Sequence, residues 1–197
     1  MRLRVALALC GAMLLGGCGT PPQERFFTLG SDPAPETRST ATGLGFTIVV
    51  GPVTVPEAVD RPQIVLRTAA NRVQIDEQAR WAAPLKSEVP RVIADHLARL
   101  LDGARTATST QRASTPPDYR VLIDIQRFDS VLQESVTIQA LWAVITTRDA
   151  TPINGRSIVT ERAGAGYEEL VAAHSRALAA VSRDIAAAIG AARTMPK

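Results

Sequence analysis

The sequence predicts an α+β fold: an antiparallel β-sheet with two α-helices packed on one face, in the order strands, helix, strands, helix. Residues 85–101 and 167–192 carry apolar residues at three- and four-residue steps, which indicates two helices that each bury one face. Other segments alternate apolar with polar residues, a pattern typical of half-buried strands. Short turns join most of these strands, so we expect hairpins and antiparallel pairing.

The first eighteen residues, MRLRVALALCGAMLLGGC, have the pattern of a bacterial lipoprotein signal. Arg2 and Arg4 precede an apolar stretch over 5–15, which at ~1.5 Å per residue is too short to cross a ~30 Å hydrocarbon core. The letters LGGC at 15–18 match a lipobox. We therefore expect cleavage before Cys18 and acylation of this residue, because several acyl chains together make a stable anchor.

The residue that follows the cysteine bears on which membrane holds the anchor. It is Gly19, whereas an aspartate at this place retains lipoproteins in the inner membrane of enteric bacteria. The sequence thus predicts the periplasmic face of the outer membrane. Cys10 leaves with the signal and Cys18 is acylated, so we expect no disulfide, redox centre or thiolate metal site.

The charge of the mature chain is close to neutral. The formal net charge of +3 includes Arg2 and Arg4, which leave with the signal. The sequence contains no basic block and no alternation of basic with aromatic residues, so nucleic acid is not an expected partner.

Two polar segments, 19–23 and 31–45, flank a short apolar run, RFFTL, at 25–29. We expect Phe26 and Phe27 to add a strand or a plug to the sheet of the main domain; the alternative is that they fill a partner's groove. The predicted organisation is a signal peptide over 1–17, a lipidated tether with a short strand over 18–45, and a single α+β domain over 46–197.

Within that domain, the strands follow from alternation and from β-branched residues. Residues 63–67 and 72–75 predict a hairpin around a turn at 69–71. In residues 119–128 and 136–145, alternate positions are apolar, and Trp142 lies on the apolar face of the second segment. The remaining predicted strands are residues 46–50 and 153–162.

The first predicted helix contains Pro90, which would break a helix interior. We expect Ser87 to be the N-cap, because Pro90 then takes the third helical position, where no intrahelical N–H is needed. Gly103 is expected to end this helix. The second helix, over 167–192, carries acidic residues in its first turn and Arg193 near its end, which favours the helix dipole.

The sequence carries few signs of catalysis. It has neither a G-x-S-x-G elbow, nor an H-E-x-x-H motif, nor a phosphate-binding loop. His96 and His174 each lie in a predicted helix among apolar residues, where a structural role outweighs a catalytic one. We therefore expect no enzyme activity, metal or cofactor, although a Ser-His-Asp site is defined by geometry and stays open at this point.

Two segments instead suit protein binding. Residues 51–65 hold three prolines among apolar residues, which predicts a stiff loop that docks at low entropic cost. The alternative is a structural crossover in which Val53 and Val55 cover the core. RWAAPL at 80–85 offers an Arg and a Trp, both favoured interface anchors, although core packing of the Trp is an equal alternative. The candidate partner-binding residues are Pro52, Pro56, Asp60, Arg61, Arg80 and Trp81.

Four motifs and two single residues carry a resemblance to a known family: FFTL at 26–29, VGPVTVPEAVDRPQIV at 50–65, Arg67, Asn71, RWAAPL at 80–85 and RFD at 127–129. In this order they resemble the periplasmic auxiliary lipoproteins of ABC-type transport systems, the paraquat-inducible protein C-like family. Pro90 departs from the family pattern. The resemblance implies an outer-membrane lipoprotein, without catalytic residues, that acts beside an MCE-domain protein and an ABC transporter.

The leading hypothesis is a non-enzymatic docking subunit of a trans-envelope lipid transport system that maintains membrane integrity, with a homo-oligomer left open. The first alternative is a lipoprotein companion of another outer-membrane assembly machine, such as lipopolysaccharide transport or a secretion pore. The second is a lipid-modifying hydrolase that uses His96 or His174.

Overall fold

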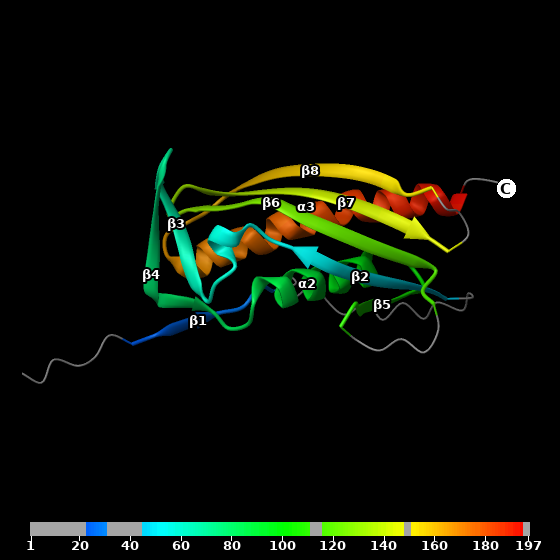
Figure 1. The fold of residues 1–197 in the computed structure, drawn as a ribbon, viewed down its shortest axis with the longest axis horizontal. Coiled ribbons are helices and arrows are strands. Elements are labelled where there is room, and N and C mark those ends of the chain that lie inside the picture. The colour runs from blue at the N-terminus through cyan, green and yellow to red at the C-terminus, as the bar shows by residue number, and fades with distance from the viewer. Residues whose placement is uncertain (1–22, 31–44, 111–115, 148–150, 195–197) are drawn as a thin grey trace, which may run out of the picture.

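The computed structural model describes residues 23–30, 45–110, 116–147 and 151–194, and in these residues eight strands form two sheets beside two long helices (Figure 1). The strands are β1 (Arg25–Phe27), β2 (Phe46–Thr54), β3 (Gln63–Ala69), β4 (Arg72–Trp81), β5 (Ala104–Thr108), β6 (Tyr119–Val131), β7 (Ser135–Thr146) and β8 (Ile153–Arg162). The helices are α2 (Leu85–Leu100) and α3 (Tyr167–Thr194), and a 3-10 turn, η1, spans Glu57–Val59.

The larger sheet has five strands in the order β5-β2-β6-β7-β8. The expected hairpins of β6 with β7 and of β7 with β8 are antiparallel. The expectation of a purely antiparallel sheet is wrong, however, because β2 runs parallel to both of its neighbours, β5 and β6. The chain between β2 and β5 passes through a hairpin and a helix, and such a long connection permits parallel pairing.

The smaller sheet has three strands in the order β1-β4-β3. β3 and β4 form the expected antiparallel hairpin, but β4 is longer than predicted and ends at Trp81. β1 pairs in parallel with the end of β4, where Phe27 is opposite Trp81. The aromatic run thus adds a strand, as expected, and it does so in this second sheet.

The helices pack against the larger sheet and against each other. α2 contacts β2 and β5, α3 contacts β7 and β8, and Figure 1 shows the two helices in one layer behind the strands. Alternate residues of the strands are buried beneath them, for example Val121, Ile123 and Ile125 of β6. One continuous core results, and it includes Phe27 and Leu29 from the N-terminal segment.

The start of α2 differs from the expectation. Pro84, not Ser87, is the N-cap residue, and its carbonyl accepts hydrogen bonds from the N–H groups of Ser87 and Glu88 at 2.8 and 3.0 Å. Pro90 is consequently the sixth helical residue, where a proline leaves one carbonyl of the preceding turn without its usual donor. Burial of the Pro90 ring in the core offsets that loss.

The end of α2 also differs in one respect. Leu100, expected on the buried face, is 45% exposed, whereas Leu101 just after the helix is buried. Gly103 has φ 77°, a left-handed conformation that suits glycine and reverses the chain into β5. The helix therefore stops near the expected glycine, one turn after its last core residue, Leu97.

Trp142 lies across Gly155 on the helix side of the sheet. A Cβ at Gly155 would lie 2.1 Å from Cζ2 of the Trp142 ring, so only glycine leaves room for it. The Trp142 indole N–H donates to Ser157 Oγ at 3.1 Å, and Ser157 in turn donates to Asp184 of α3. The indole thus joins β7, β8 and α3.

We predict that Gly155→Ala destabilises the protein by about 1–3 kcal/mol, because the new methyl group must displace the Trp142 ring. Gly190→Ala on α3 is the matched control: a Cβ added at Gly190 would meet no atom within 4 Å, and the change should stabilise by about 0.5–1 kcal/mol. Urea denaturation of both variants measures the two effects, and an unchanged midpoint for Gly155→Ala would contradict the first.

Candidate functional site

A carboxylate and a guanidinium on α2 hold the chain where it enters the domain. Glu88 Oε2 accepts hydrogen bonds from Thr28 Oγ1 at 2.6 Å and from the backbone N–H of Leu29 at 3.1 Å. Arg91 donates from Nη2 to the Leu29 carbonyl at 2.6 Å and to Glu88 at 3.0 Å. Both polar groups of the Leu29 backbone are thus paired, and its side chain is fully buried. We call these two helix residues the Glu88–Arg91 clamp.

Both residues of the Glu88–Arg91 clamp are charged. Burial disfavours the charged form of Glu88, but hydrogen bonds from Arg91, Thr28 and Leu29 outweigh it and hold the pKa of this carboxyl below its ordinary value. The hydrogen bond to Glu88 raises the pKa of Arg91. Because hydrogen bonds to charged groups are stronger than neutral ones, the clamp fixes the N-terminal segment firmly.

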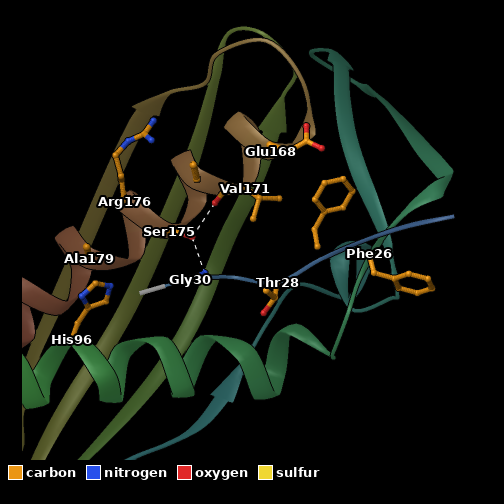
Figure 2. Close-up of a pocket in the computed structure, with 11 residues that line it drawn as sticks. Phe26, Thr28, Gly30, His96, Glu168, Val171, Ser175, Arg176 and Ala179 are labelled. Atoms are coloured by element: carbon orange, nitrogen blue, oxygen red, sulfur yellow. Dashed lines mark hydrogen bonds between the residues drawn. The ribbon is translucent and has the colours of Figure 1, made fainter. Parts of the chain in front are cut away.

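A groove of about 420 Å³ lies between α2 and α3 beside the clamp, and the N-terminal segment forms one of its walls (Figure 2). The Gly30 N–H donates to Ser175 Oγ of α3 at 3.1 Å. The two aromatic residues of this segment differ: Phe27 is buried with its ring 5.7 Å from that of Tyr167, whereas Phe26 is 61% exposed. The partner-groove alternative therefore applies only to Phe26.

The proline-rich segment is part strand and part turn. The expectation of a stiff loop is wrong for Pro52, which lies within the strand β2 of the larger sheet. A register shift between Val50 and Val53 accommodates it, and the pairing with β5 ends at Val50, so the missing N–H costs no ladder bond. Val53 is buried, as the crossover alternative expects.

The second half of this segment lies beside the start of α2. Pro56 begins the turn η1, and its carbonyl accepts from the Val59 N–H at 3.0 Å. Asp60 pairs with Lys86 of α2 at 2.6 Å. Arg61 is exposed and forms no ion pair with any acidic residue in the described ranges. This part of the segment is thus a surface turn, as predicted.

The end of β4 brings the other two candidates to the same place. Arg80 pairs with Glu24 at 3.1 Å, just before β1. The Trp81 N–H donates to the Pro62 carbonyl at 2.7 Å, but its side chain is only 5% exposed. The structure therefore gathers Pro56, Asp60, Arg61 and Arg80 around the entry of the N-terminal segment, places Pro52 on the larger sheet, and buries Trp81 in the core.

The hydrolase hypothesis is tested by the surroundings of a contact between Ser130 and His174. Ser130 Oγ lies 2.8 Å from His174 Nε2, and both residues are buried. His174 Nδ1 has no hydrogen-bond partner in the described part of the chain, and the neighbouring carboxylate, Asp129, is bound by Arg67 and Arg127. The pair thus lacks the acid and the access to solvent that a catalytic triad needs.

His96 lines the groove, where Arg99 Nη2 lies 3.3 Å from its Nδ1. Within the described ranges, no three His, Cys, Asp or Glu side chains gather closely enough to hold a metal ion. No described helix combines the length and the apolar composition needed to cross a membrane. Cys18 lies outside the described residues.

Two residues of this site, Glu88 and Arg91, were not predicted from the sequence. Glu88 and Arg91 have the i, i+3 spacing of a helical ion pair, a signal too common to single them out. Arg67 binds Asp129 through two parallel hydrogen bonds of 2.9 and 3.0 Å and so joins the two sheets. Burial opposes the charge of Asp129, yet the arginine contacts hold the pKa of its carboxyl below the ordinary value.

Comparison with known proteins gives one family and several similar folds. A family model described as "ABC-type transport auxiliary lipoprotein component" matches residues 27–186. A crystal structure of an uncharacterized protein is 18% identical at a TM-score of 0.70, covering 85% of this chain and 99% of that one. A protein from Xanthomonas campestris is 16% identical at a TM-score of 0.63, covering 82% and 92%. No curated protein matches the chain.

We predict that Glu88→Gln lowers the free energy of unfolding by about 1–3 kcal/mol at pH 7, because it removes the charge from a carboxylate that accepts four hydrogen bonds. The folded pKa is lowered, so this contribution is complete above the unfolded pKa of about 4.3 and is lost as pH falls through the folded value. Urea denaturation at pH 7 and pH 3 should show a difference between wild type and variant that shrinks in acid.

Asp95→Asn is the control for the clamp, since this carboxylate contacts the same Arg91 at 3.4 Å but is 45% exposed. It should change stability by less than about 1 kcal/mol. Equal losses for the two variants would contradict the role assigned to Glu88.

We predict that His174 stays neutral in the folded protein, because burial lowers its pKa to about 3. The unfolded state binds a proton near pH 6.5, so stability should fall as the pH drops from about 6.5 towards 3. NMR titration of the imidazole measures the pKa directly, and His174→Phe should flatten this part of the stability profile. A folded pKa near 6.5 would contradict the prediction.

Proposed function

Because the chain belongs to the family of ABC-type transport auxiliary lipoprotein components, we propose that it is a non-enzymatic docking subunit, anchored in the outer membrane, of an ABC/MCE-type system that moves lipid between the two envelope membranes and maintains membrane integrity. Membership of this family supports a membrane-anchored location in the cell envelope. The outer membrane, the MCE-domain partner and the lipid cargo are parts of the proposal.

The observation that carries the proposal is the way the N-terminal segment is built into the domain. β1 pairs with β4, and the clamp binds the next residues, so the fold is fixed from Arg25 to Gly30. Gln23, the first described residue, is five residues from Cys18, which is at most ~18 Å of chain. An acylated Cys18 thus keeps this end of the domain close to the bilayer. A docking subunit needs such a fixed end.

The surface around this end is the proposed docking surface. It consists of Pro56, Asp60, Arg61 and Arg80, and it lies where the N-terminal segment enters the domain. Arg61 is its exposed arginine without an ion pair in the described residues, and such an arginine suits an interface. An MCE-domain protein that reaches the outer membrane would meet this surface first.

We predict that deletion of the gene makes cells sensitive to detergent and that the wild-type gene, but not Cys18→Ala, restores resistance. The substitution removes the thiol that would be acylated, so the acyl anchor is lost while the fold of the domain is kept. Growth in detergent measures rescue, and immunoblots of membrane fractions show where the protein lies. Full rescue by the Cys18→Ala protein would overturn the anchoring part of the proposal.

We predict that Arg61→Glu reduces crosslinking of the native lipoprotein to an MCE-domain protein at least about fivefold, since charge reversal at an interface opposes binding. Arg183→Glu, the same change on the exposed side of α3, is the control and should have no effect. Mass spectrometry of crosslinked complexes identifies the partner. Recovery of a lipopolysaccharide-transport or secretion-pore component in its place would favour the alternative role.

A further inference from the structure

The five-stranded sheet has one covered and one open face. α2 and α3 lie on the covered face, and in the described part of the chain no helix lies on the other, where only β3 approaches β6 near one end (Figure 1). Side chains of alternate residues point to this open face. Among the described elements, none covers most of this face.

Apolar side chains form a band across the strands of the open face. Leu122 of β6 is paired with Ala143 of β7, and Leu141 lies in the next row of β7. Leu141 is 41% exposed and Ile158 of β8 is 58% exposed, which places both among the most exposed large apolar residues of the fold. Exposed apolar residues that gather across strands mark a binding surface more often than residues scattered singly.

Part of the open face forms a depression that includes Leu122 and Leu141 of this band. A depression of about 730 Å³ runs over β2, β6, β7 and β8, lined by Pro52, Leu122, Asp124, Leu141 and Asn154 among others. Four strands about 4.8 Å apart give it a length of roughly 14 Å, which equals about ten residues of α-helix. A hollow of this shape fits a helix laid across the strands better than it fits a flat bilayer.

The open face beyond the hollow carries more arginines than aspartates. Of the residues of β6, β7 and β8 that point to the open face, four are arginines and two are aspartates: Arg120, Arg127, Arg156, Arg162, Asp124 and Asp129. Asp129 is paired with two arginines, whereas Asp124, which lines the hollow, accepts hydrogen bonds from the uncharged side chains of Thr54 and Gln126. Arg120 and Arg156 are exposed and form no ion pair with a described acidic residue.

We propose that the open face binds an acidic amphipathic helix of a partner protein, with apolar residues of that helix on Leu141 and Ile158 and its carboxylates near Arg156 and Arg120. Apolar contact supplies the affinity, and the unpaired arginines select an acidic partner. The two helices on the covered face show that this sheet accepts helices, and the partner would add a third layer. The inference rests on the proposed docking role and assigns it a second surface.

The test uses the mature chain with Cys18→Ser, which is otherwise complete, and a fluorescent amphipathic peptide of about 18 residues, five helical turns of leucine and glutamate. Its counterpart carries lysine in place of every glutamate. Fluorescence anisotropy measures both affinities. We expect the acidic peptide to bind at least about tenfold more tightly than the basic one.

Single substitutions on the open face test whether the peptide binds there. Arg156→Glu and Ile158→Thr should each weaken binding of the acidic peptide about fivefold or more, because one reverses a charge and the other removes apolar surface. Arg183→Glu on the helix layer should leave binding unchanged. Both tested side chains are exposed, so thermal melts should match wild type and exclude loss of folding as the cause.

Three results would overturn the inference. These are equal affinity for both peptides, equal loss in Arg183→Glu, and displacement of the peptide by phosphatidylglycerol vesicles whose binding also depends on Arg156, which would assign the face to lipid. Self-association that Ile158→Thr abolishes would assign it to a second copy and likewise overturn it. Because peptide binding is measured without an anchor, its failure is separable from failure of the detergent-rescue experiment.

Discussion

Trp81, Phe128 and His174 meet where the two sheets and α3 join. The rings of Phe128 and His174 stack with their centroids 4.2 Å apart, and the Trp81 ring stands edge-on to both. These residues come from β4, β6 and α3, so none of the three elements can shift without opening the cluster. The position of β4 then fixes that of β1, and through it the place where the N-terminal segment meets the Glu88–Arg91 clamp.

Local patterns in the sequence predicted both helices, the β3–β4 hairpin and the β6–β7–β8 meander. They did not predict β5, because its sequence, ARTAT, has no large apolar residue, and its pairing with β2 joins segments about 58 residues apart. The parallel pairing of β2 was not predicted for a similar reason, because alternation shows that a segment is a strand but not which strand lies beside it. Pro84 takes the N-cap position in place of Ser87 without a side-chain hydrogen bond, so residue preferences for the N-cap did not reveal it.

The partner-binding role of the candidate residues stays a prediction. Pro56, Asp60, Arg61 and Arg80 are gathered at one end of the fold, although they come from two separate motifs whose proximity the sequence did not predict. The burial of Trp81 could not be predicted from the sequence. A large apolar ring suits an interface and a core equally well, and only the fold decides between them. Glu88 was not predicted, because its role depends on a contact with Leu29, 59 positions away in the chain, which no spacing within the helix reveals.

The clamp has a consequence for how often the domain meets a partner. With an anchor at Cys18, a link that ends at Gln23 is at most ~18 Å long, whereas one that ended at Gly45 would reach ~95 Å. The volume open to the domain scales as the cube of this reach and so falls on the order of a hundredfold. Fixing the six residues from Arg25 to Gly30 thereby raises the effective concentration of the domain at the membrane surface by a similar factor.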